Sequence, residues 1–485
     1  MNHQKSQALD AIDRNRELLC RVSDQLWEHP EVGFHEKYAA ELYCDTLEAL
    51  GFQVERNLAG IPTAFSGTYG NDGPVIGFLG EFDALPGLSQ VEAALEKIPA
   101  QESAPGHGCG HNLLGVGSLA AAVAVKQYLQ DNHLPGTVVF FGCPAEEGGS
   151  GKGFMARSGV FQQVDIAFSW HPGEVNSVST EGTMSNYQIC YHFRGVSAHA
   201  AMSPEQGRSA LDALELMNIG VQFLREHVPT DTRIHYAITD TGGSAPGTVQ
   251  PYAQAVYLLR AVHPQQLIDL YDRVNKIARG AAMMTDTTVE IEFIKACSNV
   301  VINTELNRLM QKNLEQVPPA GFDEADLEQA RRYQQTFPNG KTYYDSLVDE
   351  VEDPQMREEL QARADEPIHR VVMPLARERQ GFVSSDVGDV SWNCPVAQIN
   401  AATMPAGVPM HSWQMVAVGK TPMAKKGMLY AAKVMAASAI DALEDPEIIR
   451  RAKEELLRRT GGKTYQPPIP AEIQPKIPRD LFQTP

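Results

Sequence analysis

The 485-residue sequence predicts an α/β protein with a mainly parallel sheet, interrupted by a smaller ferredoxin-like domain. Short apolar runs bounded by Gly or Pro alternate with helical segments in the first part of the chain, which is typical of a parallel sheet. From about residue 187 to 298 the order becomes β-α-β-β-α-β, the order of a ferredoxin-like unit. The chain is also too long for one ordinary core, so two domains are expected.

The first part of the chain opens with helix and continues with strands. Residues 5–50 carry apolar residues at helical spacing, and Gly51 predicts the end of that helix. Three apolar runs follow, and each predicts a buried strand. They are "PVIGFLGEFDALPG" (74–87), "GTVVFFGCPAEEGG" (136–149) and "DIAFSWHPG" (165–173). Helices are predicted between them, at 113–129 and near "GKGFMARSGVF".

The inserted domain shows a second set of patterns. The expected strands are "YQICYHFRG", "RIHYAIT", "AQAVYLLRAV" and "TVEIEFIKA", and the expected helices are "SALDALELMNIGVQFLREHV" and "QQLIDLYDRVNKIARGAAMM". We therefore assign residues 187–298 to the insert, and residues 1–186 together with 299–485 to the larger domain. Residues 316–380 are charged and predicted to be helical, without recognisable chemistry.

Composition and charge exclude several classes of function. The net charge of −19 argues against nucleic acid or an anionic membrane as a partner. The N-terminus lacks the apolar region of a secretory signal, and the sequence contains no apolar run of membrane-spanning length. Seven scattered cysteines do not form the pattern of a disulfide framework. A cytoplasmic protein is expected.

The segment "GHGCGHN" (106–112) contains the first candidate metal ligands. Cys109 and His111 are two positions apart, which places both side chains on one side of an extended segment. Thiolate and imidazole are ligand types that zinc favours. A cysteine in a glycine-rich loop is more often structural, so this pair needs further partners to indicate a site.

Those partners stand where the predicted strands end. In open α/β sheets, ligands bind beyond the carboxyl ends of the strands. Glu146 and Glu147 end one strand, and adjacent carboxylates there repel each other and lose solvation. A solvated turn is the simple alternative, but a metal explains the pair better, because one carboxylate can bind it while the other polarises its water. His171 ends another strand.

Two other active-site types are excluded. "GGSGKG" (148–153) is not a phosphate loop, because Gly153 follows Lys152 where Ser or Thr is required. No G-x-S-x-G motif offers a serine nucleophile.

The ordered set of motifs is more specific than any one of them. The set is "WEHPEVGFHE", "GEFDALPG", "GHGCGHN", "CPAEEGGSGKGFM", "WHP", "GVSAHAAMSP" and "AGVPMHSW". From about residue 20 to the C-terminus, the chain resembles amidohydrolases of the aminoacylase and glutamate-carboxypeptidase metallopeptidase family.

The resemblance implies a di-metal catalytic domain interrupted by a lid or dimerisation domain, with two zinc or manganese ions. The implied metal ligands are Cys109, His111, Glu147, His171 and His411. Glu146 is the implied general base. His199, in "GVSAHAA", belongs to the lid and is expected to stabilise the oxyanion in the partner subunit's site.

Two departures from the family pattern concern the metals and the substrate. The family's H-x-D ligand histidine is replaced by Glu81 in "GEFD", so Cys109 substitutes as a ligand and Asp83 acts at most indirectly. Arg260 matches a lid arginine that binds the substrate carboxylate, but a companion asparagine is replaced by Gly247. A surface charge at the end of a strand stays an alternative for Arg260.

The resemblance implies hydrolysis of the amide bond of an N-acyl amino acid, with p-aminobenzoyl-glutamate as the first expectation. A dipeptidase for β-alanyl or basic dipeptides is one alternative. A supporting subunit that pairs with a homologous chain is another. The expected assembly is a homodimer through the lid, or a heteromer with a homologous subunit.

Overall fold

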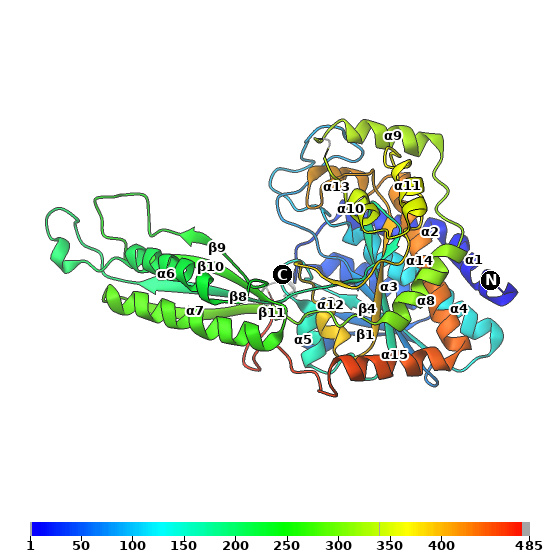
Figure 1. Cartoon of the computed structure of the whole chain (residues 1–485), viewed down its shortest axis with the longest axis horizontal. Coiled ribbons are helices and arrows are strands. Elements are labelled where there is room, and N and C mark those ends of the chain that lie inside the picture. The colour runs from blue at the N-terminus through cyan, green and yellow to red at the C-terminus, as the bar shows by residue number, and fades with distance from the viewer. Residues whose placement is uncertain (1, 339, 478–485) are drawn as a thin grey trace.

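A computed structural model describes residues 2–338 and 340–477, which form a broad body and a long projecting lid (Figure 1). The body holds a seven-stranded sheet in the order β1-β2-β4-β3-β5-β13-β6. Its strands are β1 (Gln53–Arg56), β2 (Phe65–Tyr69), β3 (Val75–Glu81), β4 (Thr137–Cys143), β5 (Ile166–Gly173), β6 (Ser177–Val178) and β13 (Val396–Ala402).

The central strands of this sheet are parallel, as the sequence predicts. Strands β4, β3, β5 and β13 run in the same direction, whereas β1, β2 and β6 pair antiparallel at the edges. Every residue of β4 is buried, because helices cover both faces of the sheet centre. The parallel centre places the carboxyl ends of β3, β4 and β5 along one edge.

Two long helices pack on the sheet and complete the core. They are α4 (His111–Asn132) and α14 (Pro422–Glu444), and both are buried over most of their length. Among the described residues, no helix is both long and apolar enough to cross a bilayer. The apolar stretch "SLAAAVAVKQYL" (118–129) belongs to α4 and is mostly buried in the core.

The single helix predicted over residues 5–50 is wrong, because the chain breaks it twice. The observed helices are α1 (His3–Arg14), α2 (Arg16–Glu28) and α3 (Lys37–Ala49). Asn15 leaves helical geometry at φ −95° and ψ 8°. Pro30 disfavours helical backbone at His29, and a loop follows in which Phe34 has a φ of +63°.

The lid has the predicted ferredoxin-like order, with a sheet arranged β11-β8-β10-β9. Its elements are β8 (Ser185–Arg194), α6 (Ala210–Leu224), β9 (Arg233–Asp240), β10 (Tyr252–Ala261), α7 (Pro264–Met284) and β11 (Thr288–Cys297). Helices α6 and α7 cover one face, where Tyr191, Tyr257 and Leu259 are fully buried. Alternate residues of the strands point to the face without helices.

The remaining elements lie mainly in the C-terminal half. The helices are α5 (Gly151–Arg157), α8 (Thr304–Gln316), α9 (Glu324–Gln334), α10 (Tyr343–Asp349), α11 (Pro354–Gln361), α12 (Val387–Ser391), α13 (Trp413–Val418) and α15 (Pro446–Arg459). Short 3₁₀ helices occupy Leu58–Gly60, Pro204–Gln206 and Arg225–His227, and β7 (Glu181–Gly182) pairs with β12 (Arg379–Gln380). The helical prediction for 316–380 is wrong after residue 361, where Pro367 and Pro374 interrupt the chain.

Candidate metal centre

The carboxyl ends of three neighbouring strands bring the predicted site residues together. Glu81 ends β3, the acidic pair follows β4, and His171 lies near the end of β5. His111 begins helix α4, after the glycine-rich loop that carries Cys109. Gly110 precedes the helix with a φ of +79°, a backbone geometry that favours glycine and lets the loop turn sharply into α4.

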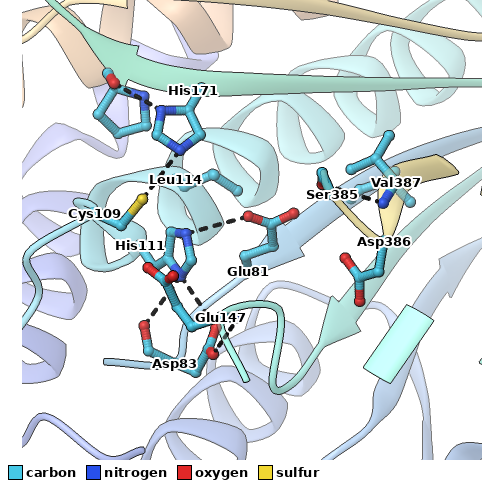
Figure 2. Close-up of polar contacts among 12 residues, drawn as sticks. Glu81, Asp83, Cys109, His111, Leu114, Glu147, His171, Ser385, Asp386 and Val387 are labelled. Carbon is cyan, nitrogen blue, oxygen red and sulfur yellow. Dashed lines mark hydrogen bonds and ion pairs between the residues drawn. The ribbon is translucent and has the colours of Figure 1, made fainter. Parts of the chain in front are cut away.

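All five predicted metal ligands converge in two overlapping groups. Cys109, His111 and His171 form the first group, and Cys109, Glu147 and His411 form the second. Within each group the candidate ligand atoms lie within 4.8 Å of one another. Cys109 belongs to both groups, so its thiol lies near the candidate ligand atoms of each. Figure 2 shows Cys109, His111 and His171 facing a common centre.

The polar atoms of these groups fit a pair of cations. His111 Nε2 and Glu147 Oε1 are buried and form no hydrogen bond among the described residues. Each has one ion-pair neighbour: Glu81 Oε2 lies 3.3 Å from His111 Nε2, and His411 Nε2 lies 3.6 Å from Glu147 Oε1. His171 Nδ1 lies 2.8 Å from the carbonyl oxygen of Pro172, so Nδ1 donates there and Nε2 is left facing Cys109 Sγ at 3.4 Å. Burial raises the pKa of the Cys109 thiol to about 12. A neighbouring cation would favour the thiolate.

Asp83 orients two of the candidate ligands, as Figure 2 shows. Its Oδ1 lies 3.1 Å from His111 Nδ1, and its Oδ2 accepts a hydrogen bond of 3.0 Å from the backbone N–H of Glu147. This contact directs Nε2 of His111 toward the cluster. The position of Asp83 agrees with the indirect role expected for it.

Glu146 lies beside the cluster and next to a second carboxylate. Its carboxylate, that of Glu81 and the imidazole of His111 have ligand atoms within 4.8 Å of one another. Burial, with a contribution from Glu81, raises the pKa of the Glu146 carboxyl to about 8. A carboxyl whose pKa lies near neutrality suits proton transfer in both directions.

A buried ion-pair network lies behind Glu81, and the sequence motifs did not predict it. Lys152 Nζ lies 2.7 Å from Glu81 Oε1 and 2.6 Å from Asp386 Oδ1, and all three side chains are almost inaccessible to solvent. The backbone N–H of Lys152 also donates to Asp386 at 2.9 Å. The sequence held one indication that Lys152 is buried: it stands between small and apolar residues in "GKGFM" (151–155).

Glu36 was not predicted either, and it holds the turn that carries the acidic pair. Its buried carboxyl accepts a 2.8 Å hydrogen bond from the backbone N–H of Ala145, which has a φ of +56°. Gly33 lies so close to Ala145 that an added Cβ would approach its Cβ to 2.9 Å. The motif "WEHPEVGFHE" therefore supports the turn before Glu146.

The structure does not bring His199 or Arg260 into this cluster. His199 is exposed in the loop that follows β8. Strand β8 runs away from the body, so this loop lies at the far end of the lid (Figure 1). Its Nδ1 accepts hydrogen bonds from the backbone N–H groups of Ala201 and Met202. Arg260 lies on the helix-free face of the lid and donates to Ser384 Oγ of the body at 3.0 Å. Gly247 has no neighbour within 4 Å of an added Cβ.

Known proteins share both the sequence and the fold. The model of peptidase family M20/M25/M40 matches residues 77–342. One of the p-aminobenzoyl-glutamate hydrolase subunits of Escherichia coli is 42% identical over 468 residues, which cover 96% of this chain and 97% of that protein. Xaa-Arg dipeptidase of Mus musculus is 31% identical over 301 residues, which cover 59% of this chain and 65% of that protein.

A solved structure supports the same fold. The Bacillus subtilis YXEP protein, described as a dinuclear metal binding peptidase of the M20 family, superposes with a TM-score of 0.57 at 15% identity. The superposition covers 89% of this chain and 99% of that chain. The family model and the 42% identical relative confirm the family resemblance drawn from the ordered motifs: the chain belongs to peptidase family M20/M25/M40.

Proposed function

We propose that this chain hydrolyses the amide bond of an N-acyl amino acid, and that p-aminobenzoyl-glutamate is its substrate, cleaved to p-aminobenzoate and glutamate. The observation that carries hydrolysis is the convergence of five ligand side chains beside Glu146. The choice of substrate is supported by the relative that matches nearly the whole chain at 42% identity. The full ligand set argues against an inactive supporting subunit.

In the proposed mechanism, two divalent ions would be held by Cys109, His111, His171, Glu147 and His411. Zinc is favoured by the thiolate, and manganese is compatible with the carboxylate. When bound, such ions lower the pKa of a water and polarise the substrate carbonyl.

The protein residues then move the proton and stabilise charge. Glu146 accepts the proton of the attacking water and passes it to the leaving nitrogen, so one carboxylate serves as base and then as acid. We propose that His199 of a second subunit donates a hydrogen bond to the developing oxyanion. We also propose that Arg260 binds the substrate carboxylate. Its Nε is buried and has no partner among the described residues.

A substrate panel tests the proposed function. The panel contains p-aminobenzoyl-glutamate, β-alanyl-lysine and an acyl-amino-acid amide that lacks the carboxylate. We expect kcat/KM of the metal-loaded protein to be highest for p-aminobenzoyl-glutamate. Loss of that carboxylate should cost roughly 10- to 100-fold, the range for a hydrogen bond to a charged group. Preference for the dipeptide would replace the proposal with a dipeptidase, an alternative to which the 31% identical relative lends weight. Indifference to the carboxylate would remove Arg260 from the site.

We further propose a homodimer that forms through the lid. Strand β9 is an edge strand of the lid sheet, and its Tyr236 and Ile238 are 40% and 44% exposed. On α6, Ile219 and Phe223 are 52% and 70% exposed. An exposed edge strand next to exposed apolar side chains is suited to pairing with a second chain. A heteromer with a homologous chain would use the same surface, and the name of the 42% identical relative describes it as one subunit of a hydrolase.

Mixing two inactive variants tests the role of His199 between subunits. Glu146→Gln and His199→Ala homodimers should each be slow, but a mixed dimer contains one site with both an intact Glu146 and an intact His199 from the partner. We expect activity to reappear on mixing, measured as turnover after subunit exchange is verified by mass. Exchange without recovered activity would show that His199 does not act in trans.

We also propose a cytoplasmic location. All seven cysteines are free thiols in the structure, as expected in a reducing compartment.

A further inference from the structure

A cavity of about 340 Å³ opens directly beside the candidate metal centre. Glu147, Gly148 and Gly149 form one wall, and the side chains of Phe34, Leu85, Pro86 and Phe154 contribute an apolar lining. Ile294 and Lys295 of the lid strand β11 close another side, and Lys476 stands at its edge. The cavity is therefore built from the turn after β4, which carries Glu147, and from β11, the lid strand that leads back to the body.

A β-bulge in β11 directs the side chain of Lys295 toward the cavity. The pairing of β11 with β8 shifts register between Phe293 and Lys295, so that Lys295 pairs with Gln188. Phe293 packs in the lid core, whereas Lys295 falls in register with the helix-free face. Bulges commonly re-aim a side chain next to a functional site.

Lys295 is a buried lysine that has no carboxylate partner among the residues the structure describes. Its exposed fraction is 8%. Its Nζ has one hydrogen bond, of 3.4 Å to the backbone carbonyl of Glu147, and no carboxylate oxygen within 4.0 Å in residues 2–338 and 340–477. Buried charges are normally paired, because an unpaired one loses its hydration without compensation. The other lysine of the cavity, Lys476, already forms an ion pair with Glu292.

We propose that this cavity receives the side chain of the leaving amino acid and that Lys295 binds its terminal carboxylate. The inference rests on the proposed hydrolysis of an acylated glutamate and identifies the residue that selects glutamate. The apolar walls suit the methylene groups of that side chain, and the ammonium of Lys295 suits its acidic end. Lys295 is thus a specificity residue, separate from Arg260, which is proposed for the other carboxylate.

The experiment compares p-aminobenzoyl-glutamate with p-aminobenzoyl-glutamine, which has the same shape but no side-chain charge. The unaltered metal-loaded chain should prefer the glutamate compound. Lys295→Met should lower kcat/KM for that compound roughly 10- to 100-fold, chiefly through KM, and change the glutamine compound little. Lys295→Arg should restore part of the preference. Lys476→Met should have a smaller effect, because that ammonium is already paired.

An equal loss on both compounds would overturn the proposal, since Lys295 would then only support the carbonyl of Glu147. Equilibrium binding to metal-loaded Glu146→Gln protein, with and without Lys295→Met, separates this inference from the proposed function. If the unaltered chain hydrolyses neither compound, the proposed function fails. The inference still stands if Glu146→Gln protein binds the glutamate compound more tightly than the glutamine compound and Lys295→Met removes that preference. It is wrong if Glu146→Gln protein binds the two compounds equally well.

Discussion

We expect Glu146→Gln protein to keep its metal ions and its fold but to turn over at least about 10²-fold more slowly than the unaltered chain. Glutamine fills the same space and cannot accept or return a proton, so the loss falls on kcat. Steady-state kinetics on the metal-loaded variant measure the loss, and elemental analysis measures the bound ions. Both must be measured on the same preparation.

Glu147→Gln is the matched control, because it changes the same chemical group one residue away. Glu147 belongs to a ligand group with Cys109 and His411, so its variant should bind fewer ions per chain than Glu146→Gln protein. Normal turnover by Glu146→Gln protein would remove Glu146 from the mechanism. Loss of metal from both variants alike would show that the two carboxylates share one role.

We expect the free energy of unfolding of Lys152→Met protein to be about 3–5 kcal/mol lower than that of the unaltered chain. Methionine fills the volume but leaves Glu81 and Asp386 buried without their shared cation. Removing one partner of a buried ion pair costs more than the pair itself contributes, because the remaining charges stay desolvated. Urea unfolding of the metal-free protein measures this loss without any contribution from bound ions.

A triple variant tests that explanation. Combining Lys152→Met with Glu81→Gln and Asp386→Asn removes all three charges, so it should recover a large part of the lost stability. If the triple variant is no more stable than Lys152→Met, packing rather than charge accounts for the loss. An unchanged stability of Lys152→Met protein would contradict the importance of the network.

The sequence predicts those features that depend on neighbours along the chain. Buried parallel strands are continuous apolar runs in the sequence, so β3, β4 and β5 can be predicted from the sequence alone. Because parallel strands end at one edge, the acids and the histidine that follow them are expected to meet there. Cys109 and His111 are close together in the chain, and their ligand chemistry is a property of residue type.

Contacts between distant residues needed the tertiary structure. The break at Asn15 contains no proline or glycine to announce it, and Lys152 meets Asp386 across 234 positions of sequence. Glu36 reaches Ala145 across 109 positions, and the bulge before Lys295 has no distinct residue pattern. Lys152, Glu36 and Lys295 are all buried, so the role of each depends on the partners that folding brings to it.

The sequence by itself determined the fold class, the family and the residue types of the candidate metal centre, because periodicity and local motifs carry this information. The tertiary structure alone decided which charges are neutralised behind the site, which lysine lacks a carboxylate partner among the described residues, and that His199 lies outside its own chain's ligand groups. The physical reason is that an ionisable side chain acts according to its desolvation and its nearest charges, and those are set by segments that meet only when the chain folds.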